Sequence, residues 1–320
     1  MNDLNRRQFF HRSTQAGMAL AAAGALVETN PLQADDASEA AASRAKIGVF
    51  TKSFQDRSIP EVCRIFKEMG LDGLDLTVRR GGHIDPADVE EKLPAAKQAA
   101  VEAGVEILFL TTGITDADAD AERLIATAAE LGINKIKMGY YRYESFGTLA
   151  KQMTAVQKRM ESVVQLASKY HVLPCVHIHS GAFIPSHGTM LYQLINQFSP
   201  DEIGAYVDPL HMTMEGSKDG WRQGLDLLAP WIALCSVKNF RWEPGPRGKQ
   251  GEVVWKTRNV PLADGICSIP KFTQALKQLG FEGPYSLHSE YKASHSFKRL
   301  DTEGCIRQTA EDFKFFRPLV

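Results

Sequence analysis

Four short apolar runs in the second half of the chain each end in side chains that could do chemistry. The runs end in Val176-His177-Ile178-His179, Tyr206-Val207-Asp208, Ser236-Val237-Lys238-Asn239 and Leu287-His288-Ser289-Glu290. Alternate residues of a strand face the same side, so each run would separate its polar side chains from its apolar ones. Imidazoles, carboxylates and an ammonium group gathered at one end of a sheet could hold a cation or transfer a proton.

Strand-like runs and amphipathic helical segments alternate along the whole chain. Four expected helices end at a glycine, as C-capped helices do, namely Gly70, Gly104, Gly132 and Gly280. The expected strands are residues 47–51, 73–78, 105–111, 135–138, 173–179, 203–208, 232–239 and 284–290. The expected helices are residues 59–69, 86–103, 119–131, 146–170, 190–198, 220–228, 269–279 and 302–316.

About eight strand–helix repeats predict an α/β fold, a single (β/α)8 TIM barrel, whose active site lies at the C-terminal ends of the strands. A doubly wound open sheet is the alternative, but no Gly-x-Gly-x-x-Gly sequence follows a strand. The longest stretch expected to be irregular, residues 240–264, follows the seventh strand and would lie on the catalytic face.

The N-terminus has the features of an export signal. Asn5-Arg6-Arg7-Gln8-Phe9-Phe10 precedes a weakly apolar stretch, residues 16–27, which is too short to span a bilayer permanently. We therefore expect a twin-arginine signal peptide at 1–34, a linker at 35–45 and the barrel at 46–320. The expected location is periplasmic or extracytoplasmic, with no stable membrane insertion after signal removal; a disordered basic tail is the alternative.

The composition limits the kinds of partner that we expect for this protein. The net charge is −1, so no basic surface suggests a nucleic acid partner. The chain has five cysteines without paired spacing, and Cys175 and Cys235 lie in apolar runs, which predicts buried thiols.

Four further motifs occur in order along the chain. They are Gly70-Leu71-Asp72-Gly73-Leu74-Asp75-Leu76, Val207-Asp208-Pro209-Leu210-His211, Val237-Lys238-Asn239, and Gly280-Phe281-Glu282-Gly283-Pro284 followed by Glu290. Together they resemble motifs of the xylose isomerase-like barrel superfamily, often labelled sugar phosphate isomerase/epimerase. The resemblance covers nearly all of the chain after the leader.

The resemblance implies one divalent metal, held by Glu, Asp, His and Glu on strands five to eight. This chain has His177 at the first of these positions and Ser236 at the third. We expect His177, Asp208 and Glu290 to bind Mn²⁺, Zn²⁺, Mg²⁺ or Co²⁺, with His211 or His179 as a fourth ligand. Loss of the metal is the alternative.

The resemblance also implies proton abstraction next to the carbonyl of a small-molecule sugar. The residues expected to carry this catalysis are Lys238, His179, Glu290 and His288, with Lys238 either a base or an oxyanion donor. The residues expected to bind substrate are Arg79, His83, Tyr140, His211 and Trp242; packing or surface exposure is the alternative for each.

We therefore expect a sugar isomerase or epimerase. The altered strand-five and strand-seven positions keep two alternatives open, a lyase or hydrolase of 3-keto-glycosides and a non-catalytic sugar-binding barrel. The identity of the sugar and the oligomeric state stay open.

Overall fold

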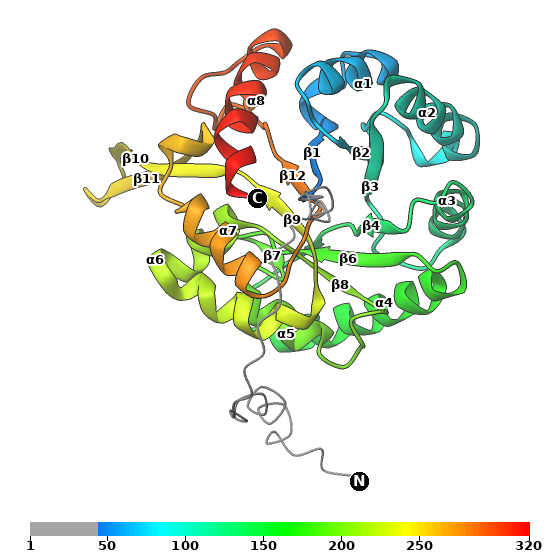
Figure 1. The fold of residues 1–320 in the computed structure, drawn as a ribbon. Helices are drawn as coiled ribbons and strands as arrows, with labels where there is room; N and C mark the ends of the chain where they lie inside the picture. The colour runs from blue at the N-terminus through cyan, green and yellow to red at the C-terminus, as the bar shows by residue number, and fades with distance from the viewer. Residues whose placement is uncertain (1–43) are drawn as a thin grey trace, which may run out of the picture. The chain divides into compact units, whose positions relative to one another are not determined.

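Eight parallel strands form a closed barrel in the computed structural model, which describes residues 44–320 (Figure 1). This confirms the predicted (β/α)8 TIM barrel. The predicted signal peptide and the linker up to residue 43 lie outside the described residues. Around the barrel the strands are β1 (Ile47–Phe50), β12 (Tyr285–Leu287), β9 (Ile232–Val237), β8 (Gly204–Val207), β6 (Leu173–His177), β4 (Lys135–Lys137), β3 (Glu106–Thr112) and β2 (Gly73–Val78).

The first strand closes the barrel by pairing on both sides. Ile47 is in register with Tyr285 of β12, and Gly48 is in register with Gly73 of β2. Glycine is required at Gly73 because a Cβ there would lie 2.2 Å from the carbonyl oxygen of Glu106. Contacts far apart in the sequence therefore hold the two ends of the barrel sheet together.

The helices surround the barrel, as Figure 1 shows. Helix α1 begins at a capping box in which Ser58 and Glu61 each bond the other's backbone N–H. Gly70, Gly104, Gly132 and Gly280 all have positive φ, which confirms their predicted capping role. The helices are α1 (Ile59–Glu68), α2 (Val89–Ala103), α3 (Ala119–Glu130), α4 (Leu149–Lys169), α5 (Gly188–Ile195), α6 (Pro209–Leu228), α7 (Ile269–Gln278) and α8 (Thr302–Phe316).

Two segments differ from the sequence prediction. Helix α6 begins directly after Asp208, eleven residues earlier than expected (220 − 209 = 11), because Asp208 caps it and Pro209 takes the first helical position.

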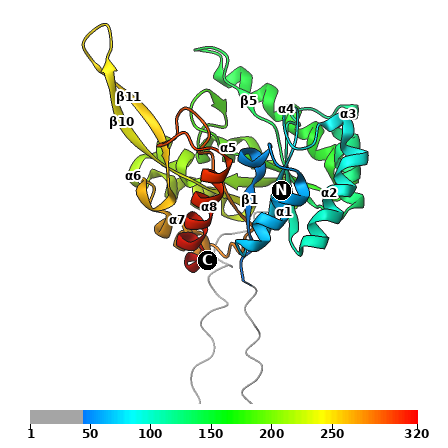
Figure 2. The ribbon, with the colours of Figure 1, turned by 90° about the horizontal axis from the view of Figure 1, so that it is seen from above.

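The stretch predicted to be irregular is instead a hairpin of β10 (Asn239–Arg247) and β11 (Val253–Val260). Figure 2 shows this hairpin and β5 (Tyr141–Arg142) extending from the same side of the barrel. Strand β5 pairs with β7 (Phe183–Ile184).

Apolar side chains fill the space between the barrel and its helices, and Phe109, Cys175, Tyr206 and Leu234 form a second, smaller cluster. All five cysteines are buried and unpaired, which confirms the prediction for Cys175 and Cys235. Within residues 44–320, no helix combines the length and the apolar character that crossing a membrane requires.

Candidate functional site

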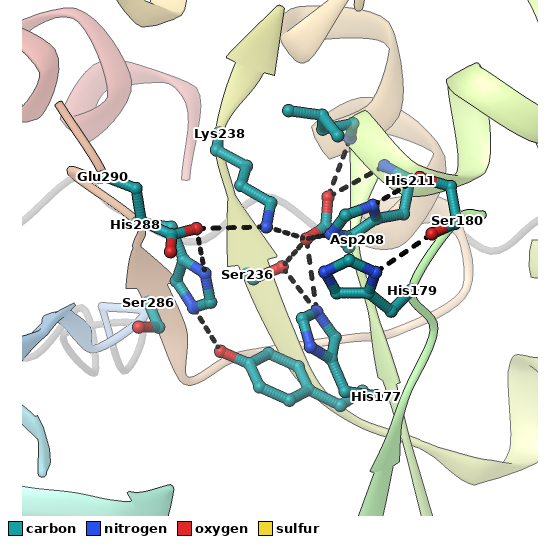
Figure 3. A network of polar contacts seen from close by, with 12 residues as sticks. His177, His179, Ser180, Asp208, His211, Ser236, Lys238, Ser286, His288 and Glu290 are labelled. Carbon is teal, nitrogen blue, oxygen red and sulfur yellow. Dashed lines mark hydrogen bonds and ion pairs between the residues drawn. The ribbon is translucent and has the colours of Figure 1, made fainter. Parts of the chain in front are cut away.

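The polar ends of four neighbouring strands converge in one cluster at the C-terminal end of the barrel (Figure 3). Strand β6 supplies His177, with His179 just beyond it; β8 leads to Asp208; β9 supplies Ser236 and leads to Lys238; and β12 leads to His288 and Glu290. Helix α6 adds His211. The structure therefore places all four expected catalytic residues in one cluster, together with His177 and Asp208 of the expected metal ligands, whereas Glu290 is separated from Asp208 by Lys238.

Asp208 is the fully buried centre of this cluster. Its Oδ1 accepts hydrogen bonds from the backbone N–H of Leu210 (2.8 Å) and His211 (3.2 Å) at the start of α6. Its Oδ2 accepts from the hydroxyl of Ser236 at 2.6 Å. Burial alone would raise the pKa of Asp208, but Lys238 and the neighbouring donors outweigh it and hold that pKa well below its ordinary value. Asp208 is therefore an anion.

Lys238 lies between two carboxylates. Its Nζ is 3.4 Å from Oδ2 of Asp208 and 3.3 Å from Oε2 of Glu290, as Figure 3 shows. Burial alone would lower the pKa of Lys238, but these two carboxylates outweigh it and raise that pKa. Of its two predicted roles, base or oxyanion donor, the charged state favours the donor.

Glu290 is held by two lysines. Its Oε1 accepts from Nζ of Lys52 at 2.6 Å, and its Oε2 faces Lys238. Burial would raise the pKa of Glu290, but Lys238 and Lys52 outweigh it and hold that pKa well below its ordinary value. Because both oxygens of Glu290 are engaged by lysines, its lone pairs are less available to take a proton than those of a neutral imidazole in the cluster.

His179 presents a neutral base. Its Nδ1 lies 3.0 Å from the carbonyl oxygen of Ser180. Because a carbonyl only accepts hydrogen bonds, Nδ1 carries the proton and Nε2 keeps a lone pair. Burial, followed by the charge of Lys238, lowers the pKa of His179 to about 4. The imidazole is therefore unprotonated at neutral pH.

Two other histidines offer buried nitrogens that have no hydrogen-bond partner among residues 44–320, namely Nε2 of His211 and Nδ1 of His288. The opposite nitrogen of each ring is fixed: Nδ1 of His211 lies 2.8 Å from Oγ of Ser180, and Nε2 of His288 lies 2.9 Å from the hydroxyl of Tyr206. Buried polar atoms normally have partners, so a substrate hydroxyl is a natural partner for both.

His177 lies below these groups. Its Nε2 donates to Oδ2 of Asp208 at 3.2 Å, and its Nδ1 accepts from the hydroxyl of Tyr140 at 2.9 Å. Its ring stacks on Tyr206 with 4.4 Å between centroids. Burial lowers the pKa of His177 well below its ordinary value, so the ring is neutral.

The expected substrate-binding residues divide into two groups. Tyr140 and His211 join the cluster. His83 is held between the side chains of Thr51 and Thr77 and the carbonyl of Phe54, so both of its ring nitrogens already have partners.

Arg79 lies 5.5 Å above the ring of Phe50, which stacks on His288. Trp242 lies on β10, 45% exposed, and packs edge-on against Phe240. Arg79 is therefore one side chain removed from the cluster, whereas no hydrogen bond or ring contact joins Trp242 to the cluster within residues 44–320.

The sequence interpretation missed four residues of the barrel interior. Asp75 accepts from Thr111 (2.5 Å), Ser286 (2.9 Å) and Tyr206 (3.4 Å), and so links the base of the site to β2. Lys137 is buried, its Nζ is without a hydrogen-bond partner among residues 44–320, and it lies 3.4 Å from the centre of the Tyr140 ring. The alternation in Leu74-Asp75-Leu76 and Lys135-Ile136-Lys137 was the available signal, since it places a charged side chain inside a barrel strand. The missed residues are Asp75, Lys137, Tyr206 and Ser286.

One group of side chains could hold a metal ion. The ligand atoms of His177, Asp208 and His211 lie within 4.8 Å of one another, and Glu290 is outside this group. The charges around it do not suit a divalent ion, however, because Asp208 and Glu290 are already matched by the ammonium groups of Lys238 and Lys52. A divalent ion at Asp208 would lie beside Lys238, and like charges repel strongly in a buried site.

The closed barrel and the polar residues at its strand ends define a TIM-barrel protein with a candidate active site on the C-terminal face of the barrel. Residues 63–318 match the family model described as xylose isomerase-like TIM barrel. The chain therefore belongs to the xylose isomerase-like TIM barrel family. No curated protein matches the sequence.

Three solved structures show the same fold. The 3-keto-D-glucoside 4-epimerase of E. coli has a TM-score of 0.62 at 16% identity, covering 86% of this chain and 100% of its own. The structure of D-psicose 3-epimerase from Clostridium cellulolyticum with D-tagatose has a TM-score of 0.63 at 12% identity, covering 86% of this chain and 99% of its own. A xylose isomerase-like TIM barrel protein of Mycobacterium smegmatis, in complex with magnesium, has a TM-score of 0.60 at 14% identity, covering 86% of this chain and 97% of its own. Such identities establish the likeness of fold alone.

Proposed function

We propose that this protein is an enzyme that abstracts a proton from the carbon next to a sugar carbonyl, as an isomerase or epimerase does. The observation that supports this most directly is the pairing of a neutral base, Nε2 of His179, with the ammonium group of Lys238 in one cluster. Base and electrophile are the two groups that enolisation requires.

The proposed steps use groups of this chain only. Nε2 of His179 takes the proton, and the electron pair of the C–H bond moves to the carbonyl oxygen. Lys238 donates a hydrogen bond to the resulting oxyanion, since an ammonium has three N–H groups and the two carboxylates engage two. The hydroxyl proton on the carbon that lost its hydrogen then passes to the oxyanion, which leaves a new carbonyl at that carbon. The protonated His179 delivers its proton to the former carbonyl carbon, which completes an isomerisation.

Binding of the sugar is proposed for His211 and His288. Nε2 of His211 lies 3.6 Å from Oδ2 of Asp208, and Nδ1 of His288 lies 4.0 Å from Oε2 of Glu290. Both distances exceed hydrogen-bond length, so sugar hydroxyls could bond both nitrogens (Figure 3). Leaving such groups unpaired costs about 1–3 kcal/mol each, so a hydroxylated substrate is favoured over an apolar one.

A second candidate, cleavage of a 3-keto-glycoside, is favoured because the cluster offers a single available base, His179. Epimerisation usually needs bases on both faces of the substrate, and lysines engage both oxygens of Glu290. In the elimination, His179 takes the proton of the carbon next to the ketone. The C–O bond to the leaving alcohol then breaks, and the alkoxide takes up a proton, giving an unsaturated keto-sugar and an alcohol.

Proton abstraction is tested by deuterium exchange. Free ketoses and 3-keto-disaccharides are incubated with the protein in D₂O, and NMR follows both exchange and products. We expect exchange next to the carbonyl, slowed about 10²–10⁴-fold in His179→Ala. The control, His171→Asn, changes an exposed histidine away from the cluster and leaves the rate unchanged. Absence of exchange with every keto-sugar would contradict the proposal and favour a sugar-binding barrel.

We also propose that the protein is exported from the cytoplasm. The arginine pair and weakly apolar stretch of the leader support transport by the twin-arginine pathway to a periplasmic or extracytoplasmic location. An exported enzyme meets unphosphorylated sugars and glycosides, so we propose these small molecules, and no nucleic acid, as its partners.

A further inference from the structure

We propose that the ammonium group of Lys238 takes the place of a divalent cation in this site. The wild-type protein then carries no stoichiometric metal, and removing the Lys238 charge turns His177, Asp208 and His211 into a metal site. The inference goes beyond the proposed function, because metal content is measured without any sugar.

The first argument is position. Nζ of Lys238 lies between two carboxylates that follow the strands on either side of β9, 3.4 Å from Oδ2 of Asp208 and 3.3 Å from Oε2 of Glu290. Its side chain is only 7% exposed, and Figure 3 shows it extended along β9 into this gap. A cation that joins Asp208 to Glu290 is therefore built into the fold.

The second argument is the state of the ligand atoms. Oδ1 of Asp208 accepts two backbone N–H groups, and its Oδ2 accepts from Ser236 at 2.6 Å. Both oxygens of Glu290 face lysines. An incoming metal would have to displace Lys238 or the Ser236 hydroxyl to reach the lone pairs of Asp208.

The third argument is charge. The cluster holds two carboxylates, Asp208 and Glu290, and two ammonium groups, Lys238 and Lys52, so these four groups sum to zero (−2 + 2 = 0). A divalent ion would add two positive charges beside the buried ammonium group of Lys238, where such an addition is strongly unfavourable.

Without Lys238, the side chains of His177, Asp208 and His211 would suit a metal ion. Nδ1 of His177 bonds the Tyr140 hydroxyl and Nδ1 of His211 bonds Oγ of Ser180, so both rings are oriented with Nε2 toward Asp208. Such outer hydrogen bonds orient metal-binding imidazoles in proteins. Two imidazoles and one carboxylate form a good ligand set for Zn²⁺ or Co²⁺.

The test is metal content after loading. Wild type, Lys238→Met and Lys238→Met/Asp208→Asn are each incubated with Zn²⁺ or Co²⁺, passed through a desalting column and measured by elemental analysis. We expect wild type to keep little metal and Lys238→Met to keep about one equivalent, a gain of roughly tenfold or more. The added Asp208→Asn change removes that gain. Visible absorption of Co²⁺ reports the coordination independently.

Lys52→Met is the matched control. It removes the other ammonium on Glu290 but leaves Lys238 in place, so we expect it to keep as little metal as wild type. If Lys238→Met fails to fold, Lys238→Gln takes its place, judged by circular dichroism.

Two results would overturn the inference. The first is about one equivalent of metal in wild type that Asp208→Asn removes. The second is a folded Lys238→Met, or its replacement, that binds no more metal than wild type. Deuterium exchange measured on the same samples tests the proposed function separately, since a metal-free wild type without exchange would contradict only that function.

Discussion

At the scale of single residues, neighbours decide what a buried lysine does. Lys238 and Lys137 are both buried inside the barrel. Lys238 lies between two carboxylates, which keep it charged and suit it to stabilise an oxyanion. Lys137 has no carboxylate within hydrogen-bonding distance among residues 44–320, and burial lowers its pKa well below the ordinary value. The same residue type is thus a charged hydrogen-bond donor at one position, whereas at the other position burial disfavours its charged form.

Lys137→Met is expected to stabilise the protein by about 1–3 kcal/mol, because it replaces an unsatisfied buried amine with an apolar side chain of similar size. Urea unfolding measures the change. The control is Lys135→Met on the same strand, whose side chain is partly exposed and should shift stability by less than about 0.5 kcal/mol. A loss of stability in Lys137→Met would mean that the amine has a favourable partner, such as an ordered water.

At the scale of elements, the junction of β8 and α6 builds the centre of the site. Asp208 ends the strand and caps the helix, so one carboxylate both starts α6 and anchors Lys238. His211 follows within the first turn and faces the same carboxylate at 3.6 Å. Farther along, α6 is interrupted at Ser217, whose φ of 54° and ψ of −156° fall in a region that side chains disfavour.

Ser217→Gly is expected to raise the free energy of unfolding by about 1 kcal/mol, because glycine adopts this backbone conformation without steric cost. Ser217 is exposed, so little contact is lost. Ser217→Ala, which keeps the Cβ and the strain, is the comparison and should show no gain. Thermal unfolding of both variants measures the difference, and equal midpoints would argue against strain at this position.

At the scale of the whole molecule, barrel closure joins residues that are far apart in the sequence. Lys52 follows β1 and Glu290 follows β12, yet the two side chains are 2.6 Å apart. On the opposite end of the barrel, Arg317 donates to the carbonyl of Ala45 at 2.7 Å and to Asp72 at 3.0 Å. Residues near the beginning and the end of the described chain therefore contact each other at both ends of the barrel.

The proposed export is tested on the full chain. In a bacterial host with twin-arginine transport, we expect the wild type in the periplasmic fraction, shortened by roughly 34 residues. Arg6→Lys/Arg7→Lys should leave the protein in the cytoplasm at full length, because the pathway reads the arginine pair. Mass spectrometry of each fraction measures both. Arg12→Lys serves as the control, and normal processing of the double variant would refute this route.

The sequence by itself determined the barrel and the strand ends that carry the site. Strand and helix periodicity depends on local residue order, so all eight strands, the glycine caps and the clustering of His179, Lys238, His288 and Glu290 could be predicted. The hairpin of β10 and β11 was missed because Gly and Pro residues obscure its alternation. The early start of α6 was missed although Asp208-Pro209 is a typical helix start.

Only the tertiary structure decided how the site is charged. Sequence spacing places Lys238 and Glu290 at the same end of the barrel, but it does not show that Lys238 fills the gap between Asp208 and Glu290. It also does not show that Lys52 reaches Glu290, or that Ser180 fixes the protonation of His179. The charges of Lys238, Asp208 and Glu290 depend on distances of a few ångströms between side chains that follow different strands, and barrel closure sets those distances. The proton on His179 depends instead on the backbone conformation of the next residue, which sequence spacing does not give.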